Sequence, residues 1–271
     1  MDVVSLGFRT DLALLQLGGS VVEDRGDHLV VRSPHNPGHW WGNFLLLAAP
    51  PAPEDAARWV ERHAVTFAGR RHVSLGFDGT SGTADILSGF LALGLTAEAQ
   101  TVMTATSVRS DGPHPEADCR QLCSDDDWQQ CVELQVRCND GEDPALHRPY
   151  AEARAATQRG LVEAGHGGWF GAFVDGRLAC QMGLFAASPG LARFQSVETD
   201  PAFRRLGIAR ALVQHVSGYG FEQLGARTLV MVADPDYFAI DLYRSVGFAA
   251  TESQLQSERR PEAATPPGDA R

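Results

Sequence analysis

Short apolar runs alternate with amphipathic helical segments along the chain, and the same order of elements occurs twice. The first half predicts strand, helix and strand at residues 44–48, 54–68 and 72–78. The second half repeats this order at residues 192–199, 206–221 and 228–233. Each half continues with a short helix and a final strand, and each has its own hairpin ahead of the repeat. This weak internal repeat predicts an old duplication into two lobes.

Two such lobes make an α+β protein in which each sheet is mixed, mainly antiparallel and flanked by helices. The segment 110–118 is polar and rich in proline, so we place the boundary between the lobes there. We predict a first lobe at 1–112, a linker at 113–117 and a second lobe at 118–257. Residues 258–271 lack an apolar period, which predicts a flexible tail.

Two helix starts are expected from capping residues. Thr10 is a candidate N-cap for a helix that stops at Gly18 and Gly19. The segment from Ser124 to Trp128 is expected to start a second helix, whose first turn carries three aspartates where the helix dipole favours negative charge.

Charge and residue usage exclude several functional classes. The 271 residues include 34 acidic and 23 basic side chains, and the net charge of −11 argues against a nucleic-acid partner. All 23 basic residues are arginine, so a lysine Schiff base, a P-loop and a Ser-x-x-Lys hydrolase are excluded. The longest apolar stretch, residues 44–52, contains two prolines and is too short to cross a bilayer. Residues 1–10 lack the features of a secretory signal, so we expect a cytoplasmic protein without a membrane partner.

The cysteines raise the question of a metal site. The chain has five of them, an odd number that favours reduced thiols in a chain of this size. The spacing of the first four matches no common zinc pattern. We therefore expect no metal. The cysteines are Cys119, Cys123, Cys131, Cys138 and Cys180.

The segment from Arg204 to Ala209 carries the strongest chemical signal. It follows a predicted strand and a proline and opens a predicted helix, where successive backbone N–H groups and the helix dipole favour an anion. Gly207 allows close approach of a phosphate, and the arginines supply positive charge. This pattern predicts a diphosphate cradle. The alternative is an ordinary amphipathic helix whose apolar side chains face the core.

Two stretches resemble the GNAT superfamily of N-acetyltransferases. Residues 197–213, with Arg204-Arg-Leu-Gly-Ile-Ala209 at their centre, are similar to motif A of that family, and residues 239–248 (Ala-Ile-Asp-Leu-Tyr-Arg-Ser-Val-Gly-Phe) are similar to its motif B. The resemblance covers residues 117–257, and the first half resembles a degenerate copy of the same fold.

The resemblance implies a set of roles. The pyrophosphate of acetyl-CoA would bind the backbone and arginines of Arg204, Arg205, Leu206, Gly207, Ile208 and Ala209. The pantetheine arm would pair with the backbone at Val197 and Thr199, and Tyr243 would protonate the departing thiolate. A positioned phenol suits that step, because it supplies both a hydrogen bond and a proton. The alternative for Tyr243 is a tyrosine packed beneath the sheet.

The chain departs from the family pattern in two places of the second half. Asp236 stands where the family often has an asparagine that contacts pantetheine, and an ionised acid accepts but does not donate hydrogen bonds. The family's usual base positions hold Arg193 and Gln195, neither of which is a base. Glu198 is the nearest carboxylate, although a one-residue offset turns a strand side chain to the other face. A water relayed by Gln195, or an amine that is already neutral, would also serve.

In the first half, residues 50–55 replace the cradle with three prolines and two acids, so we expect one cofactor site. We expect His39, Trp40 and Trp41 to form core at the lobe interface rather than a substrate cage.

The resulting hypothesis is an acetyl-CoA-dependent N-acetyltransferase that acts on a small-molecule or peptide amine, with a homodimer as a further expectation. The alternatives are transfer of another acyl group, another acceptor, or a CoA-binding module without turnover.

Overall fold

The computed structural model describes residues 1–70, 72–109, 116–139, 144–236 and 239–260. The strands are β1 (Val21–Asp24), β2 (His28–Arg32), β3 (Phe44–Leu47), β4 (Val73–Phe77), β5 (Thr96–Ala105), β6 (Asp118–Gln121), β7 (Gly167–Val174), β8 (Arg177–Ser188), β9 (Leu191–Thr199), β10 (Thr228–Ala233) and β11 (Ala249–Arg259). The α-helices are α1 (Leu6–Leu17), α2 (Ala56–Thr66), α3 (Ser88–Ala92), α4 (Asp125–Arg137), α5 (Pro144–Glu163), α6 (Ile208–Glu222) and α7 (Ala239–Val246). Short 3-10 turns include η2 (Pro53–Asp55) and η4 (Pro201–Phe203).

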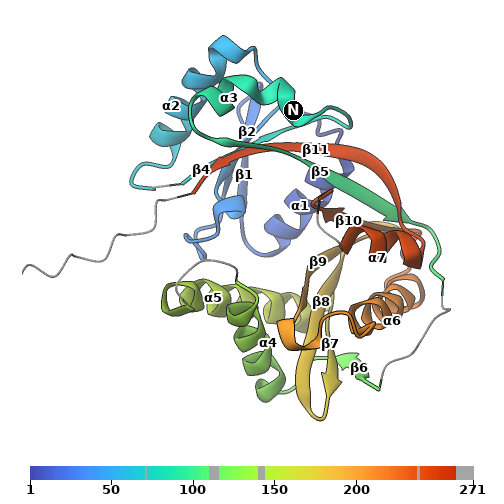
Figure 1. Ribbon diagram of the computed structural model, residues 1–271. Coiled ribbons are helices and arrows are strands. Elements are labelled where there is room, and N and C mark those ends of the chain that lie inside the picture. The colour runs from blue at the N-terminus through green and yellow to red at the C-terminus, as the bar shows by residue number, and fades with distance from the viewer. Residues whose placement is uncertain (71, 110–115, 140–143, 237–238, 261–271) are drawn as a thin grey trace, which may run out of the picture.

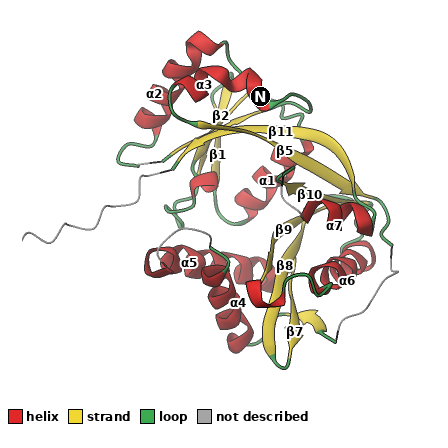
Figure 2. Cartoon of the chain, viewed as in Figure 1, coloured by secondary structure: helices red, strands yellow, loops and turns green. Residues whose placement is uncertain are grey.

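The strands form one mixed sheet in the order β1-β2-β3-β4-β11-β5-β10-β9-β8-β7-β6 (Figures 1 and 2). The pairs β3–β4 and β9–β10 are parallel, and the other neighbouring pairs are antiparallel. The α+β class with a mainly antiparallel sheet flanked by helices is therefore confirmed. The two parallel pairs occupy equivalent places in the two halves, as the repeated order of elements predicts.

The two halves share strands at their junction. The last strand of the chain, β11, lies between β4 and β5 of the first half, and β5 in turn pairs with β10 of the second half. Figure 1 shows β5 and β11 running together across the molecule from one half to the other. The sheet is thus continuous, whereas the repeat alone predicts a separate sheet in each lobe.

Two of the expected boundaries, the linker and the start of the tail, can be compared with the structure. The linker expected at 113–117 lies mostly outside the described residues. β11 continues to Arg259 and so includes the first two residues of the tail expected at 258–271, and Glu258 is buried. The pairing of β11 with both β4 and β5 explains this extension, because it fixes the strand on two sides.

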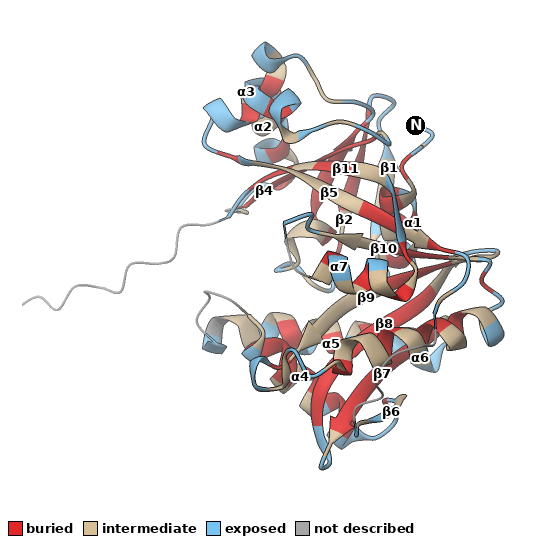
Figure 3. Ribbon diagram, turned by 45° about the vertical axis from the view of Figure 1, so that its right-hand side comes forward, coloured by how far each residue is buried: buried red, intermediate tan, exposed pale blue. Residues whose placement is uncertain are grey.

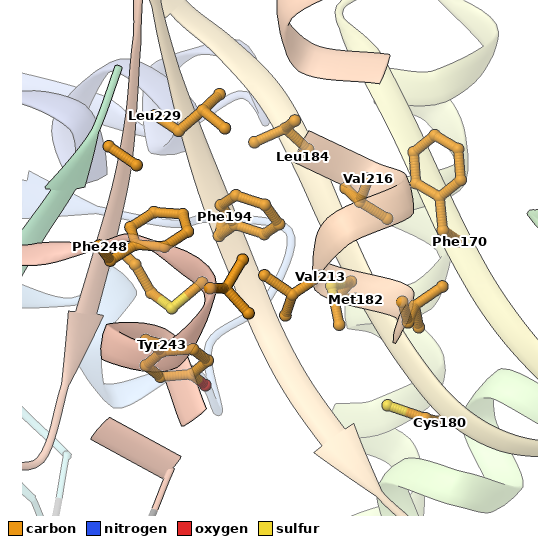
Figure 4. Packing of buried hydrophobic residues seen from close by; sticks show 14 of the residues in the cluster. Phe170, Cys180, Met182, Leu184, Phe194, Val213, Val216, Leu229, Tyr243 and Phe248 are labelled. Atoms are coloured by element: carbon orange, nitrogen blue, oxygen red, sulfur yellow. The ribbon is translucent and has the colours of Figure 1, made fainter. Parts of the chain in front are cut away.

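Helices cover both faces of the second-half strands. One cluster of buried side chains joins α6 and α7 to Phe194, Met231 and other residues of the sheet (Figure 4). Another joins α4 and α5 to the opposite face and includes the fully buried Trp169. In Figure 3 β7 and β8 are buried along most of their length, whereas buried residues occur at intervals along α6. Burial on both faces explains the nearly unbroken apolar sequence of these strands.

The helix starts agree in part with the capping residues. α4 starts after Ser124 as predicted, and Ser124 caps it with a capping box that includes Asp127. The prediction for Thr10 is wrong: α1 begins at Leu6, Ser5 is its cap, and Thr10 lies within the helix. Its hydroxyl donates to the carbonyls of Leu6 and Gly7, which satisfies a polar group inside the helix. No helix among the described residues has the length and apolar character needed to cross a bilayer.

Candidate active site

The parallel strands β9 and β10 separate after only three paired positions. Their register runs from Leu191 opposite Thr228 to Arg193 opposite Val230. Beyond this point β9 continues to Thr199 and β10 to Ala233 without further pairing between them. Each strand therefore presents backbone groups toward the widening gap. A gap of this kind can accept an extended ligand arm as an additional strand.

A β-bulge lies on β9 beside this gap. Gln195 is opposite Gly183 of β8 and Glu198 is opposite Gln181, so three steps along β9 match two steps along β8. Ser196, within the bulge, has a positive φ of 45°. Because Gln181 and Gly183 lie on one face of β8, Glu198 shares a face with Gln195. The offset expected from a regular strand is therefore wrong, and the bulge is its cause.

The Glu198 carboxylate lies half-buried among polar partners. Nε2 of Gln181 donates to its Oε2 at 2.6 Å, and Nε1 of Trp169 lies 3.3 Å from Oε1 of Gln181. Burial raises the pKa of Glu198, and this effect exceeds the opposing attraction of the Arg154 guanidinium. Arg154 belongs to α5 and also donates to the Ser196 hydroxyl in the bulge. A carboxyl group with a raised pKa, held in place by hydrogen bonds, suits proton transfer.

The predicted cradle lies at the start of α6. Gly207 is the N-cap, with φ 79° and ψ −2°, and a side chain added there would meet no atom within 4 Å. The first hydrogen bond of the helix at its start runs from the Ala211 amide to the Gly207 carbonyl at 3.1 Å. The amides of Ile208 and Ala209 precede it, where helix geometry provides no partner within the helix. The open space at Gly207 and these amides fit an anion.

Contacts with Asp200 fix the approach to the cradle. This buried carboxylate accepts from the Ala202 amide at 3.0 Å, from Arg137 of α4 at 3.0 Å and from Arg177 of β8 at 2.7 Å. Arg204 is half-buried and its Nε donates to the Thr199 carbonyl at 3.3 Å, so a substrate pairing there would share this oxygen.

Arg205 and Leu206 are exposed at the cradle, and Arg205 has a positive φ of 64°. Val197 is half-buried and follows Ser196 in the bulge. Asp236 is exposed, and its amide donates to the Asp234 carboxylate at 2.9 Å within a turn.

Tyr243 lies on α7, on the other side of β9 from Glu198. Its side chain is 5% exposed and belongs to the cluster that contains Phe194, the neighbour of Gln195 on the opposite face of the strand. Its ring lies 6.5 Å from that of Phe248. Figure 4 shows the hydroxyl at the end of the ring that points away from Phe248. Tyr243 and Glu198 therefore lie on the two sides of the strand that borders the gap.

The equivalent place in the first half is closed. β3 and β4 remain together past their last registered pair, since the Asp78 amide donates to the Leu47 carbonyl at 2.8 Å. η2 follows at the position of the cradle, and α3 packs against it. A side chain at Gly89 of α3 would lie 2.4 Å from the Pro53 carbonyl oxygen, so the two backbones are in close contact. This packing leaves no room for a ligand arm beside Pro53.

A cavity of about 350 Å³ lies between the halves and reaches the gap. Gln195 of β9 and Val232 of β10 line it where these strands part, and Arg154 lines it from α5. His39 and Trp41 line it from the first half, whereas Trp40 stacks on His72 at 6.1 Å. The expectation that this aromatic patch is interface core is therefore incomplete, because two of its three residues face the cavity.

Two residues of this site have no signal in the sequence motifs. Gln181 contacts Glu198 only because β8 and β9 are paired in this register, and Arg154 contacts Ser196 only because α5 crosses the bulge. An isolated glutamine within the apolar sequence of β8 would have been a weak indication for Gln181. The five cysteines are free thiols. Among the described residues, no group of three or more His, Cys, Asp or Glu side chains could hold a metal ion.

Comparisons with known proteins agree with this geometry. Residues 128–248 match the family model described as the acetyltransferase (GNAT) family. A search of curated proteins gives no match. Several solved structures share the fold at low sequence identity. A GCN5-related N-acetyltransferase from Kribbella flavida has a TM-score of 0.62 and 15% identity, covering 94% of this chain and 96% of that one.

Two further structures are similar over most of their length. A conserved protein of unknown function from Staphylococcus epidermidis has a TM-score of 0.67 and 14% identity, with 89% of this chain and 94% of that one covered. A tandem GNAT protein from the clavulanic acid biosynthesis pathway has a TM-score of 0.55 and 13% identity, with 93% and 89% covered.

Proposed function

We propose, from the match of residues 128–248 to the acetyltransferase (GNAT) family model, that the chain transfers an acetyl group from acetyl-CoA to an amine. The observation that carries the proposal is the gap between β9 and β10, which begins after Arg193 and lies beside the N-terminus of α6. A pantetheine arm paired with β9 at Val197 would extend from the cradle toward the cavity between the halves.

The cradle residues would hold the diphosphate of the acyl donor. The backbone from Arg205 to Ala209 supplies N–H groups at the positive end of the α6 dipole, and Arg204 and Arg205 supply charge. The open space at Gly207 supports this assignment, because a phosphate must approach the backbone closely there. Asp236 has the least support as a residue of the proposed donor site. Its backbone amide already donates to Asp234 and would not be available to the donor.

Glu198 is proposed as the base. Its carboxylate would take the proton from the attacking amine, while Gln181 holds the carboxylate and Arg154 limits the rise of its pKa. Gln195 lies on the same face and lines the cavity, so a water held by Gln195 could carry the proton to Glu198. The bulge at Ser196 is what brings these two side chains together.

Tyr243 is proposed as the acid. The amine nitrogen forms a bond to the thioester carbonyl carbon, the carbon–sulfur bond breaks, and the Tyr243 hydroxyl gives its proton to the departing thiolate. The products are an N-acetylated amine and CoA with a free thiol. The base and the acid would thus act from opposite sides of β9.

Direct transfer is favoured over transfer through a cysteine. Cys138 lies near the gap, with its Sγ 3.5 Å from the Thr199 carbonyl oxygen, but burial raises its pKa to about 12. A thiol with this pKa is protonated at neutral pH and is a poor nucleophile.

The test is an acceptor screen that measures release of the CoA thiol from acetyl-CoA with a broad panel of amines. Amine-dependent release, with an acetylated product of matching mass, would support the proposal. Binding of CoA without release in the presence of any amine, thiol or alcohol would contradict it and favour a binding module.

A further inference from the structure

We propose that the cavity between the two halves is the acceptor site. Its ligand would be a small molecule that has one amine together with several uncharged hydroxyl or amide groups. This inference rests on the proposed acetyl transfer and specifies its substrate class. It is carried by the position of the cavity, by the pairing of its charged side chains and by its many neutral hydrogen-bonding groups.

The position of the cavity connects it to the reaction centre. Val232 and Gln195 line it on the two strands that border the gap, just beyond the last paired residues Val230 and Arg193. An acyl group at the end of an arm lying in the gap would face this space. A volume of about 350 Å³ falls within the range of small-molecule sites.

The charged side chains of the lining are already engaged with partners in the protein. Nη2 of Arg193 lies 2.8 Å from the Asp11 carboxylate, and its Nη1 donates to the Thr10 hydroxyl at 3.0 Å. Arg154 donates to the Tyr150 hydroxyl at 3.2 Å and is attracted to Glu198. A ligand carboxylate or a second ammonium group would therefore have to displace an internal partner, which disfavours strongly charged acceptors.

Neutral amide side chains form the floor of the cavity. Gln254 of β11 is directly opposite Gln100 of β5, and Gln256 lies on the same face of β11. Nε2 of Gln100 and Nε2 of Gln256 donate to the same Glu98 oxygen at 3.0 and 2.9 Å. Glu98 thereby orients both amides and leaves their carbonyl oxygens directed away from it. The two strands that supply this floor are those that cross between the halves.

Gln158 adds a buried amide group to the lining of the cavity. This residue of α5 lines the cavity, is 6% exposed, and its Oε1 is buried without a hydrogen-bond partner among the described residues. A buried carbonyl oxygen normally receives a donor, and leaving it unpaired is costly. Rotation of the Gln158 amide toward the cavity would let a ligand hydroxyl or amide N–H supply that donor. An acceptor lacking such groups would leave the oxygen unpaired, and this difference gives selectivity.

An apolar wall completes the site. Phe8, Phe44 and Trp41 line the cavity from the first half, and the Trp41 indole is fixed by its N–H, which donates to Glu258 at 2.8 Å. An indole and two phenyl rings beside a row of amides suit a ring-shaped, hydroxylated molecule, which has both apolar faces and polar edges. The first half would thus supply acceptor recognition, while the second half supplies the donor site.

The test compares three amines. Two share a six-membered ring and differ in their hydroxyl groups, and the third carries several charges. The probes are glucosamine, cyclohexylamine and spermidine, each assayed for CoA release with the wild-type chain. With kcat/KM expressed per concentration of neutral amine, we expect the value for glucosamine to exceed that for cyclohexylamine and for spermidine by at least about 10-fold, since leaving a buried polar group unpaired is costly. Equal values, or a preference for spermidine, would overturn the proposal.

Two variants test the named side chains. Gln158→Leu and Gln256→Leu should each reduce the ratio of glucosamine to cyclohexylamine kcat/KM by about 10-fold, mainly through KM for glucosamine. Gln16→Leu, on the exposed side of α1, is the matched control and should leave the ratio unchanged. Equal losses for both amines would indicate a structural role and overturn the assignment. Thermal melting with and without acetyl-CoA checks the fold of each variant.

A binding measurement separates this inference from the proposed function. Glucosamine is titrated calorimetrically into the full chain in the presence of CoA, with no turnover required. Binding that Gln158→Leu weakens, together with no acetylation of any amine, would support the ligand class and contradict acetyl transfer. Acetylation of apolar or polycationic amines without glucosamine binding would support acetyl transfer and overturn the ligand class. Neither binding nor turnover would overturn both.

Discussion

Gln181 and Glu198 lie opposite each other on β8 and β9, and the Gln181 amide donates a 2.6 Å hydrogen bond to the Glu198 carboxylate. The pairing depends on the bulge at Ser196, which brings Glu198 to the face that carries Gln195. Without the extra residue, Glu198 would point toward Phe194 and the core beneath α6. One inserted residue therefore decides whether this carboxylate faces the cavity side of the sheet.

Glu198→Gln should reduce kcat by about 100-fold, because it removes the base and keeps the size of the side chain. Burial raises the pKa of Glu198 above 4.5, so wild-type activity should fall as the pH drops toward that raised value. The variant should lose this acidic limb of the pH–rate profile. Glu163→Gln, at an exposed site on α5, is the control. An unchanged limb in Glu198→Gln would assign the base to another group.

Gly207→Val should abolish the thermal stabilisation that CoA gives the wild type. The substitution places a branched side chain in the space beside the cradle and requires a positive φ that valine rarely adopts. The strain alone lowers stability, so Gly225→Val is the matched control: Gly225 has φ 61° and open space, and lies after the far end of α6. The control should melt earlier yet keep the CoA shift. A wild-type shift in folded Gly207→Val would place the diphosphate elsewhere.

The sequence predicts the parts of this structure that depend on local patterns. The repeated order of elements, the start of α4 at Ser124 and the glycine at the start of α6 all follow from side-chain spacing and capping chemistry. Thr10 shows the limit of such reasoning. It is an acceptable cap residue, but the helix is capped by Ser5, five residues earlier, where the Val4 and Ser5 amides also donate to Asp78 of the first half.

Contacts between distant segments could not be predicted in this way. The position of β11 between β4 and β5 depends on pairing between residues 145 to 186 positions apart in the sequence, and no local propensity specifies it. The face of the sheet on which Glu198 lies depends on a bulge. The bulge requires a positive φ at Ser196, and the sequence does not indicate it. Arg154 and Gln158 become visible as site residues only once α5 is placed against the cavity.

Acid should destabilise the first half through His63. This side chain is 1% exposed, accepts from the Ser74 amide at 3.3 Å, and has a pKa lowered to about 4 by burial and by neighbouring His72. Its folded pKa is below the unfolded value of 6.5, so its contribution to stability is complete above pH 6.5 and is lost as the pH falls toward 4. Between pH 7 and pH 5 the loss should be about 2 kcal/mol.

Urea denaturation of wild type and His63→Gln at both pH values measures this contribution. The variant keeps a hydrogen-bond acceptor but cannot be protonated in this range, so its loss of stability on acidification should be smaller by about 2 kcal/mol. Equal losses in the two proteins would mean that other groups govern the acid sensitivity.

The chain should bind one CoA per molecule. In the first half β3 and β4 stay hydrogen-bonded at Asp78, and α3 packs against Pro53 where a ligand arm would lie. The acids Glu54 and Asp55 would also repel a diphosphate. Isothermal titration calorimetry should give a stoichiometry near one, and Gly207→Val should remove the binding heat altogether. Residual binding in that variant would indicate a second site.

Tyr243→Phe separates a catalytic role from packing. The change removes one oxygen and keeps the ring against Phe248, so the fold and the affinity for CoA should change little. If the phenol protonates the departing thiolate, kcat should fall by about 100-fold, while KM for acetyl-CoA stays within a few-fold, because the lost interaction belongs to the transition state. Tyr219→Phe is the matched control: that tyrosine lies on α6, half-buried against Phe170, and its substitution should leave kcat unchanged. An unchanged rate in Tyr243→Phe would assign the proton to solvent or to another donor, while the acetyl transfer itself would still be supported by turnover of the wild type.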